Sequence, residues 1–184
     1  MVYETVEQLF SHIEKIREKL IQSVSNLSDE QAASRRAPEA WTIAEIVEHL
    51  SITEKSLLRV VNKLLEKAES EGIKLETKGV FNPPLSLAAE AEKAKDIKVQ
   101  APDFLIPNNA ASITASLDSL SQSRAALNEL RDRIETVDSS NMKFPHPAFG
   151  PINLCQWVAF IGMREAHHLR QIKETFEKTA EAKA

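Results

Sequence analysis

Apolar side chains recur every three or four positions along four long stretches of the chain, residues 3–26, 42–69, 108–134 and 154–178. An α-helix advances about 100° per residue, so this spacing gathers the apolar side chains of each stretch on one face. The pattern predicts four amphipathic helices whose apolar faces pack against one another.

Capping motifs mark where several helices begin. Thr42–Glu45 has the spacing of a capping box, in which a hydroxyl and a carboxylate each accept a hydrogen bond from a free backbone N–H. Asn153–Gln156 and Ser28–Gln31 have similar arrangements, and the latter predicts a short helical turn. Asn108 or Asn109 can cap the third long helix.

Two long connections separate the helical stretches. Residues 70–108 contain glycine and several prolines, and a structureless loop of this length is unusual in a compact domain. We therefore expect a short helix at Leu85–Lys95 and a segment that packs over the bundle as a candidate lid. Residues 138–153 are rich in proline and cannot be helical. No composition shift marks a domain boundary, so residues 1–184 are expected to form one domain.

Composition supports an all-α fold and narrows the function. The chain has 4 glycines and 5% aromatic residues, which is typical of helices rather than short strands joined by tight turns. A net charge of −4 without a basic patch argues against nucleic acid as a partner. No apolar run nears the roughly 20 residues of a membrane span, and no signal peptide is evident, so we expect a cytoplasmic protein that does not bind membranes.

Cys155 is the single cysteine, so histidine and carboxylate would have to hold any metal.

Ionisable residues interrupt the apolar faces. Glu165 and His168 fall within the apolar face of the last helix, where they require a hydrogen-bonded partner or a ligand. His49 lies at the edge of the second helix's apolar face, in line with Glu45. Arg124 interrupts the third helix: either its stem lies on apolar surface with the guanidinium in water, or it pairs with a buried acid such as Glu165.

Several segments spread along the chain share their residues and their order with a known family. They are Leu27–Gln31, Trp41–Leu50, Ala101–Pro107, His146–Pro151, Gln156–Trp157 and His168–Ile172. Together they resemble the DinB-like (DinB/YfiT) family of four-helix-bundle metalloproteins. The resemblance implies an all-α four-helix bundle with a long crossover between the second and third helices, and it also implies a homodimer.

The resemblance further implies a divalent metal, zinc or nickel, held by three histidines. Carried over to this chain, the first ligand is His49 and the last is His168, but the middle position falls on Arg164, which cannot coordinate a metal. Glu165 is a substitute third ligand, one turn before His168, whereas His167 projects about 100° away from it. Alternatively the site holds no metal, and Arg164 and the two histidines bind an anion.

The first functional hypothesis is an enzyme. The resemblance implies a metal-dependent thiol S-transferase or hydrolase that acts on a small molecule, with a low-molecular-weight thiol such as bacillithiol, mycothiol or glutathione as a partner. The candidate metal ligands are His49 and His168. The candidate catalytic residues are Glu45, Glu165 and Arg164. The candidate substrate-binding residues are Trp41, Arg124 and Trp157.

The second hypothesis is a non-enzymatic helical bundle that binds a small ligand or an anion in the same cleft. In this interpretation the metal was lost with the middle histidine, and His49 and His168 are buried polar groups satisfied by neighbouring side chains. A third class, a purely structural dimer, is supported only by the long helices and the family's dimers.

Overall fold

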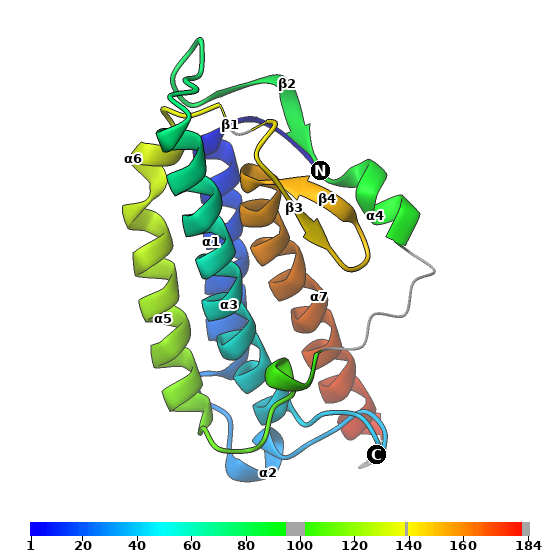
Figure 1. The fold of residues 1–184 in the computed structure, drawn as a ribbon. Coiled ribbons are helices and arrows are strands. Elements are labelled where there is room, and N and C mark those ends of the chain that lie inside the picture. Colours follow the sequence, from blue (N-terminus) through cyan, green and yellow to red (C-terminus); the bar gives the residue numbers. More distant parts are fainter. Residues whose placement is uncertain (95–101, 139, 182–184) are drawn as a thin grey trace.

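The computed structural model describes residues 1–94, 102–138 and 140–181. Within these ranges a bundle is formed by the long helices α1 (Val6–Val24), α3 (Ile43–Ser70), α5 (Ile113–Glu129) and α7 (Leu154–Glu181). Helix α1 packs against α7, and α3 packs against both α5 and α7 (Figure 1). The predicted four-helix bundle is confirmed.

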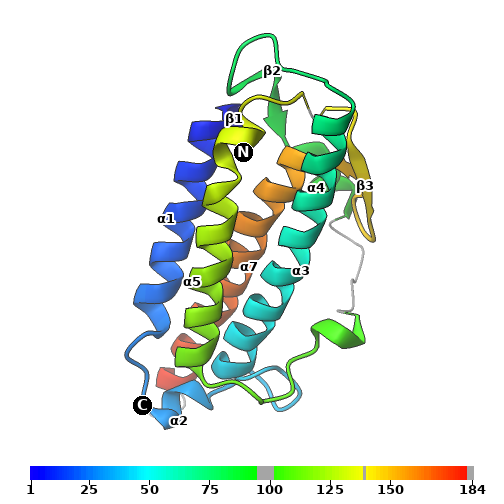
Figure 2. The same ribbon diagram turned by 60° about the vertical axis from the view of Figure 1, so that its left-hand side comes forward.

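The long crossover follows from the direction of the helices. Helices α3 and α5 are neighbours that run the same way, opposite to α1 and α7 (Figures 1 and 2). The chain between two parallel helices must return along the length of the bundle. This connection carries strand β2 (Val80–Ser86), helix α4 (Ala88–Ala94) and the short 3₁₀ helix η1 (Asp103–Leu105). The expected helix at Leu85–Lys95 begins later than predicted, because its first two residues belong to β2, and Lys95 lies outside the described residues.

The first helix also begins later than the apolar pattern indicates. Residues Val2–Thr5 form strand β1, which pairs antiparallel with β2 and sets Tyr3 opposite Leu85. Thr5 then ends the strand and caps α1, since its Oγ1 accepts a hydrogen bond from the Gln8 N–H at 3.1 Å. The prediction that the helix starts at Tyr3 is wrong for this reason.

The proline-rich connection before the last helix is a β-hairpin. Strand β3 (Lys143–His146) pairs antiparallel with β4 (Gly150–Asn153), and Pro145 lies opposite Pro151. A two-stranded hairpin tolerates proline because each strand has one edge that makes no hydrogen bonds to a neighbour. The hairpin leads directly into α7 and holds His146 beside that helix. The sequence correctly excludes helix here but does not reveal the pairing.

Three of the predicted capping motifs are present as hydrogen-bonded pairs. In α3 the Glu45 N–H donates to Thr42 Oγ1 at 3.1 Å, and the Thr42 N–H donates to Glu45 Oε2 at 2.7 Å. Asn153 and Gln156 make the same reciprocal pair at the start of α7, at 2.9 and 3.0 Å. Ser28–Gln31 does so at helix α2 (Asp29–Ala32).

The start of the third long helix corrects the sequence prediction. Ser112 caps α5, and its Oγ accepts a hydrogen bond from the Ala115 N–H at 3.1 Å. Asn109 lies upstream with a positive φ of 60°, and its backbone N–H donates to the buried Glu48 carboxylate at 2.9 Å. After Glu129 the chain makes the short helix α6 (Arg131–Ile134).

Four charged side chains divide the apolar core into two clusters. They come one from each long helix, and each is at most 4% exposed; they are Arg17, Glu54, Arg124 and Glu165. Apolar residues on either side of them in each helix belong to different clusters, such as Ile13 and Leu20 in α1. We call these four residues the charged layer.

The charged layer is connected by hydrogen bonds across the bundle. Arg17 donates from Nε to Glu165 Oε1 at 2.6 Å and from Nη2 to Glu54. Arg124 donates from Nη2 to Glu165 Oε2 at 3.2 Å and from Nη1 to Glu14 at 3.0 Å. The predicted pairing of Arg124 with Glu165 is therefore confirmed, and the alternative in which its guanidinium lies in water is wrong. The carboxylates of the layer lie against both guanidinium groups, and this pairing offsets part of the cost of burying charge.

One glycine sets how closely α1 approaches α7. A Cβ added at Gly162 would lie 2.6 Å from Cγ2 of Ile13, closer than atoms can pack. Helix α7 therefore needs glycine where it meets the core face of α1.

Among the described residues no helix is both long enough and apolar enough to cross a membrane.

Candidate functional site

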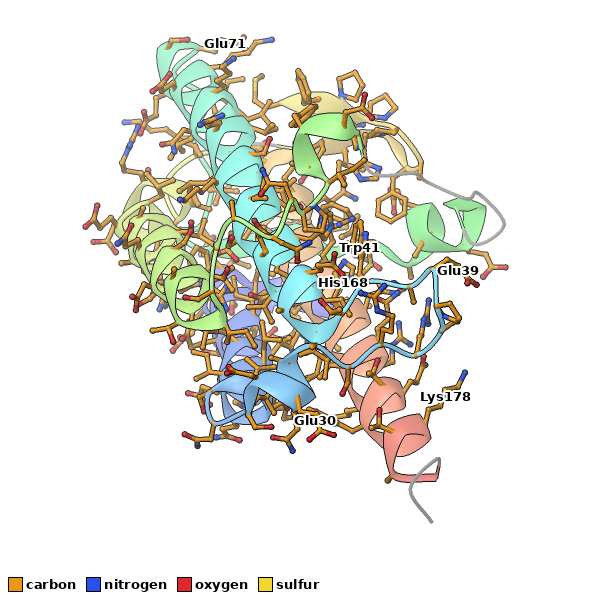
Figure 3. All side chains as sticks on the ribbon, turned by 90° about the horizontal axis from the view of Figure 1, so that it is seen from below. Glu30, Glu39, Trp41, Glu71, His168 and Lys178 are labelled. Carbon is orange, nitrogen blue, oxygen red and sulfur yellow. The ribbon has the colours of Figure 1, made fainter. Side chains whose placement is uncertain are left out.

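A cleft of about 990 Å³ opens between α3, η1, β3 and α7. Trp41, just before α3, and His168, on α7, both line it and are labelled in the view from the α2 end of the bundle (Figure 3). The crossover reaches the cleft through η1 and its neighbours, which line it, and a role of the crossover as a lid stays a prediction. Within the described residues, β2 lies away from the cleft, against β1.

Two buried imidazoles face each other across the cleft with fixed proton positions. His49, on α3, is 1% exposed, and its Nδ1–H donates to the backbone carbonyl of Leu105 at 2.7 Å. His168 is 6% exposed, and its Nδ1–H donates to Oε1 of Gln171 at 2.8 Å. In a neutral imidazole the other nitrogen is then an acceptor. Both histidines therefore present the lone pair of Nε2 to the cleft.

The guanidinium of Arg164 lies where these two lone pairs converge. Its Nη2 donates to His49 Nε2 and lies 3.4 Å from His168 Nε2. The two imidazole rings are 5.1 Å apart, centroid to centroid. Arg164, which is on α7, thus links this helix to His49 on α3 through one charged group.

Electrostatics keep both imidazoles neutral. Burial, with the nearby charge of Arg164 as a smaller cause, lowers the pKa of His49 to about 4 and the pKa of His168 to about 3. Burial also lowers the pKa of Arg164, yet a guanidinium retains its proton in proteins. At neutral pH Arg164 is therefore a fixed positive charge held by two neutral acceptors.

The residues of this cleft do not fit a metal centre. A catalytic zinc site needs three protein ligands and an open position, and among the described residues no group of three His, Cys, Asp or Glu side chains could hold a metal ion. Arg164 fills the point at which the two Nε2 atoms converge, and its charge opposes a dication there. His167 is exposed and accepts a hydrogen bond from the Gln171 amide at 3.0 Å instead.

Three of the candidate site residues do not line the cleft. Glu165 and Arg124 belong to the charged layer, where both Glu165 oxygens accept hydrogen bonds from arginine. Glu45 caps α3 and accepts a second hydrogen bond from Asn109 Nδ2 at 3.1 Å. The backbone hydrogen bond from Thr42 is the largest cause of its lowered pKa. In this structure all three carboxylate or guanidinium groups have structural partners.

The other candidate residues do meet in the cleft. Trp41 lies against His49 with the ring centroids 4.6 Å apart, and Trp157 lines the opposite side from α7. The Trp157 and Phe160 rings pack edge-on with their centroids 5.9 Å apart. Cζ of Arg164 lies over the Phe160 ring, 5.8 Å from its centroid. The cleft therefore has aromatic side chains on both sides of the Arg164 guanidinium.

Sequence reasoning missed His146 and Phe160 as cleft residues. His146 lies against Phe160 at 4.5 Å, and its Nδ1 accepts hydrogen bonds from the N–H groups of Ala148 and Phe149 at 3.1 and 3.2 Å. Burial first, and then the charge of Arg164, lowers the pKa of His146 to about 4. His146 is therefore neutral, with its proton on Nε2. The Pro145–Pro147 segment was the available signal, since prolines on both sides of a histidine fix its backbone.

The helix directions, the long crossover and the histidine-lined cleft define a class of four-helix-bundle proteins. Residues 12–172 match the DinB superfamily, and the chain belongs to this family.

The chain is also similar to individual proteins. The chain is 27% identical over 165 residues to the uncharacterized protein YuaE of Bacillus subtilis (strain 168). This match covers 86% of this chain and 91% of YuaE. The crystal structure of TT2238, a four-helix bundle protein, superimposes with a TM-score of 0.59 at 23% identity, over 92% of this chain and 98% of TT2238. YfiT from Bacillus subtilis, described as a probable metal-dependent hydrolase, has a TM-score of 0.48 at 19% identity, over 96% of this chain and 87% of YfiT.

Proposed function

We propose that this protein binds a small anionic molecule in the cleft through Arg164, and that the arginine stands where a three-histidine relative would hold its metal ion. One observation carries the proposal: Nη2 of Arg164 lies between the Nε2 atoms of His49 and His168. A dication and a guanidinium both attract an anion, so the exchange keeps the charge at this point of the cleft positive.

Arg164 differs from the buried arginines Arg17 and Arg124 in the partners of its charge. Arg17 and Arg124 each lie against carboxylates of the charged layer. Among the described residues, Arg164 has only neutral imidazoles and an aromatic ring beside it, and its Nε–H has no acceptor. A buried charge is costly unless it is paired, so an anion from solution would complete this site.

A metal-dependent thiol S-transferase or hydrolase, using zinc or nickel and a low-molecular-weight thiol, is the second candidate. It is supported by the arrangement around the two imidazoles, because metal-binding histidines commonly donate their other N–H to a carbonyl or side-chain oxygen, as His49 and His168 do here. This candidate requires Arg164 to leave its position and a third ligand to enter.

The proposal is tested by titrating the protein with acetate, phosphate and sulfate and measuring binding by calorimetry. Binding is expected in the wild type and about tenfold or more weaker in Arg164→Met, which keeps the apolar stem and removes the charge. Arg133→Ala is the matched control, because Arg133 forms an exposed pair with Glu69 outside the cleft. Equal affinities of wild type and Arg164→Met, or no binding of any of the three anions, would overturn the proposal.

A further inference from the structure

The cleft offers hydrogen-bond donors that have no acceptor within the described part of the chain. Trp157 is 4% exposed, lines the cleft and has no partner for its Nε1–H. The same holds for the Nε–H of Arg164. His146, which also lines the cleft, has its proton on Nε2, because backbone N–H groups occupy Nδ1. Buried donors without acceptors are rare, so a ligand that brings acceptor oxygens suits this cleft.

The same cleft is walled by flat rings. On one side the ring centroids of Trp41 and His49 are 4.6 Å apart, and on the other side those of Trp157 and Phe144 are 6.3 Å apart. Arg164 extends between these walls and lies over the ring of Phe160. Aromatic side chains bind flat rings by offset stacking and edge contacts, which favours a planar body next to the anionic group.

The charge balance favours one negative charge on the ligand. Arg164 is a partly buried cation of the cleft, and the carboxylates among the described residues that line the cleft, Glu39 and Asp103, are exposed. Arg36 also lines it, but that residue is 40% exposed and pairs with Glu174 at 3.2 Å. The Nε2 atoms of His49 and His168 both face Nη2 of Arg164, so the two imidazoles act as hydrogen-bond acceptors there. A phosphate dianion would leave one charge without a partner, whereas a carboxylate matches a single guanidinium.

We propose that the ligand is a planar aromatic carboxylate, with its carboxylate on Arg164, Trp157 Nε1–H and His146 Nε2–H and its ring system between the aromatic walls. This inference rests on the proposed function and names the chemical class that the cleft selects. A cleft of about 990 Å³ has room for more than a single ring, since pockets for small molecules span roughly 300–1,000 Å³. We therefore choose a two-ring acid as the probe.

The experiment compares four probes by calorimetry on the wild-type protein: 2-naphthoate, the uncharged 2-naphthamide, the saturated decahydro-2-naphthoate and 2-naphthyl phosphate. We expect 2-naphthoate to bind at least about tenfold tighter than the amide, because it alone of these two is charged. It should bind about fivefold tighter than the saturated acid, because ring contacts with the walls are lost in the latter. It should also bind tighter than the phosphate ester.

Two variants locate the bound probe. Trp157→Phe keeps the ring and removes Nε1–H, and it should weaken 2-naphthoate by about threefold while changing the amide less. Arg133→Ala, outside the cleft, should leave both affinities unchanged. Circular dichroism checks that each variant folds, and the comparison of probes on the wild type needs no variant.

Each failure has a distinct meaning. Equal affinity for 2-naphthoate and its saturated counterpart would overturn the aromatic part of the inference while Arg164-dependent anion binding stands. Tighter binding of 2-naphthyl phosphate would overturn the choice of a carboxylate. Absence of Arg164-dependent binding for every anion, acetate and sulfate included, would overturn the proposed function and this inference together.

Discussion

Arg164 and Glu165 are neighbours on α7, yet they belong to two different environments. Arg164 reaches into the cleft and lies between the Nε2 atoms of His49 and His168. Glu165 points into the core and accepts a hydrogen bond from Arg17 at 2.6 Å. Helix α7 thus points this cation and the carboxylate that follows it in sequence into different surroundings. The proposed binding of an anion by Arg164 depends on this separation.

The charged layer should be essential for stability. Glu165→Gln keeps the shape of the side chain and removes the charge that faces Arg17 and Arg124. The loss leaves buried positive charge uncompensated, so the free energy of unfolding should fall by about 3–5 kcal/mol in urea denaturation. Glu69→Gln is the matched control, because that carboxylate pairs with Arg133 at the surface and should cost at most about 1 kcal/mol. Similar losses in the two variants would contradict the role of the layer.

The approach of α1 to α7 should be sensitive to one methyl group. Gly162→Ala places a Cβ against Cγ2 of Ile13, which is β-branched and cannot turn away. We expect a loss of about 1–3 kcal/mol in the free energy of unfolding. Ile13→Leu moves the branch away from the β-carbon, so the double variant should lose less than the sum of the two single variants. Strict additivity of the two changes would show that the two residues are not in contact.

Burial of neutral His168 should make stability depend on pH. In the unfolded chain this imidazole binds a proton below its ordinary pKa of about 6.5. In the folded protein it stays neutral until the pH nears 3, so the unfolded state binds more protons between these values. Its contribution to stability is complete above pH 6.5 and is lost as the pH falls.

The measurement for this prediction is the free energy of unfolding of His168→Gln and of the wild type between pH 6.5 and 4. The slope against pH should be smaller in the variant by up to about 1.4 kcal/mol per pH unit. Burial raises the pKa of Glu54 to about 7, which acts in the opposite direction in both proteins. The difference between the two curves isolates His168, and parallel curves would refute the prediction.

Features that depend on local sequence were predictable. The helix periods and the capping pairs at Thr42–Glu45 and Asn153–Gln156 depend on residues within one turn of each other, and all of them are present. Strands β1 and β2 were not predictable, because β1 (Val2–Thr5) is too short to show a pattern and pairs with a segment about eighty residues away. The homodimer and the cytoplasmic location stay predictions.

The site was predictable only in part, because some of its contacts join residues that are far apart in the sequence. His49, His168 and Arg164 follow from the resemblance to the family, and the structure brings them together. No sequence pattern indicated Arg17 as the partner of Glu165, since a single arginine in an amphipathic helix usually faces water. His146 reaches the cleft only because the hairpin folds back on α7, and a distant pairing of this kind leaves no local signal.

Metal content tests most directly the claim that Arg164 stands in the place of a metal ion. Untagged wild type, Arg164→His, His49→Ala and His168→Ala are incubated with zinc or nickel, desalted and measured by elemental analysis. We predict that Arg164→His retains one equivalent of metal, since three imidazoles then converge, and that the wild type retains none. One equivalent on the wild type, lost in His49→Ala and His168→Ala, would contradict the account and favour the metal-dependent enzyme.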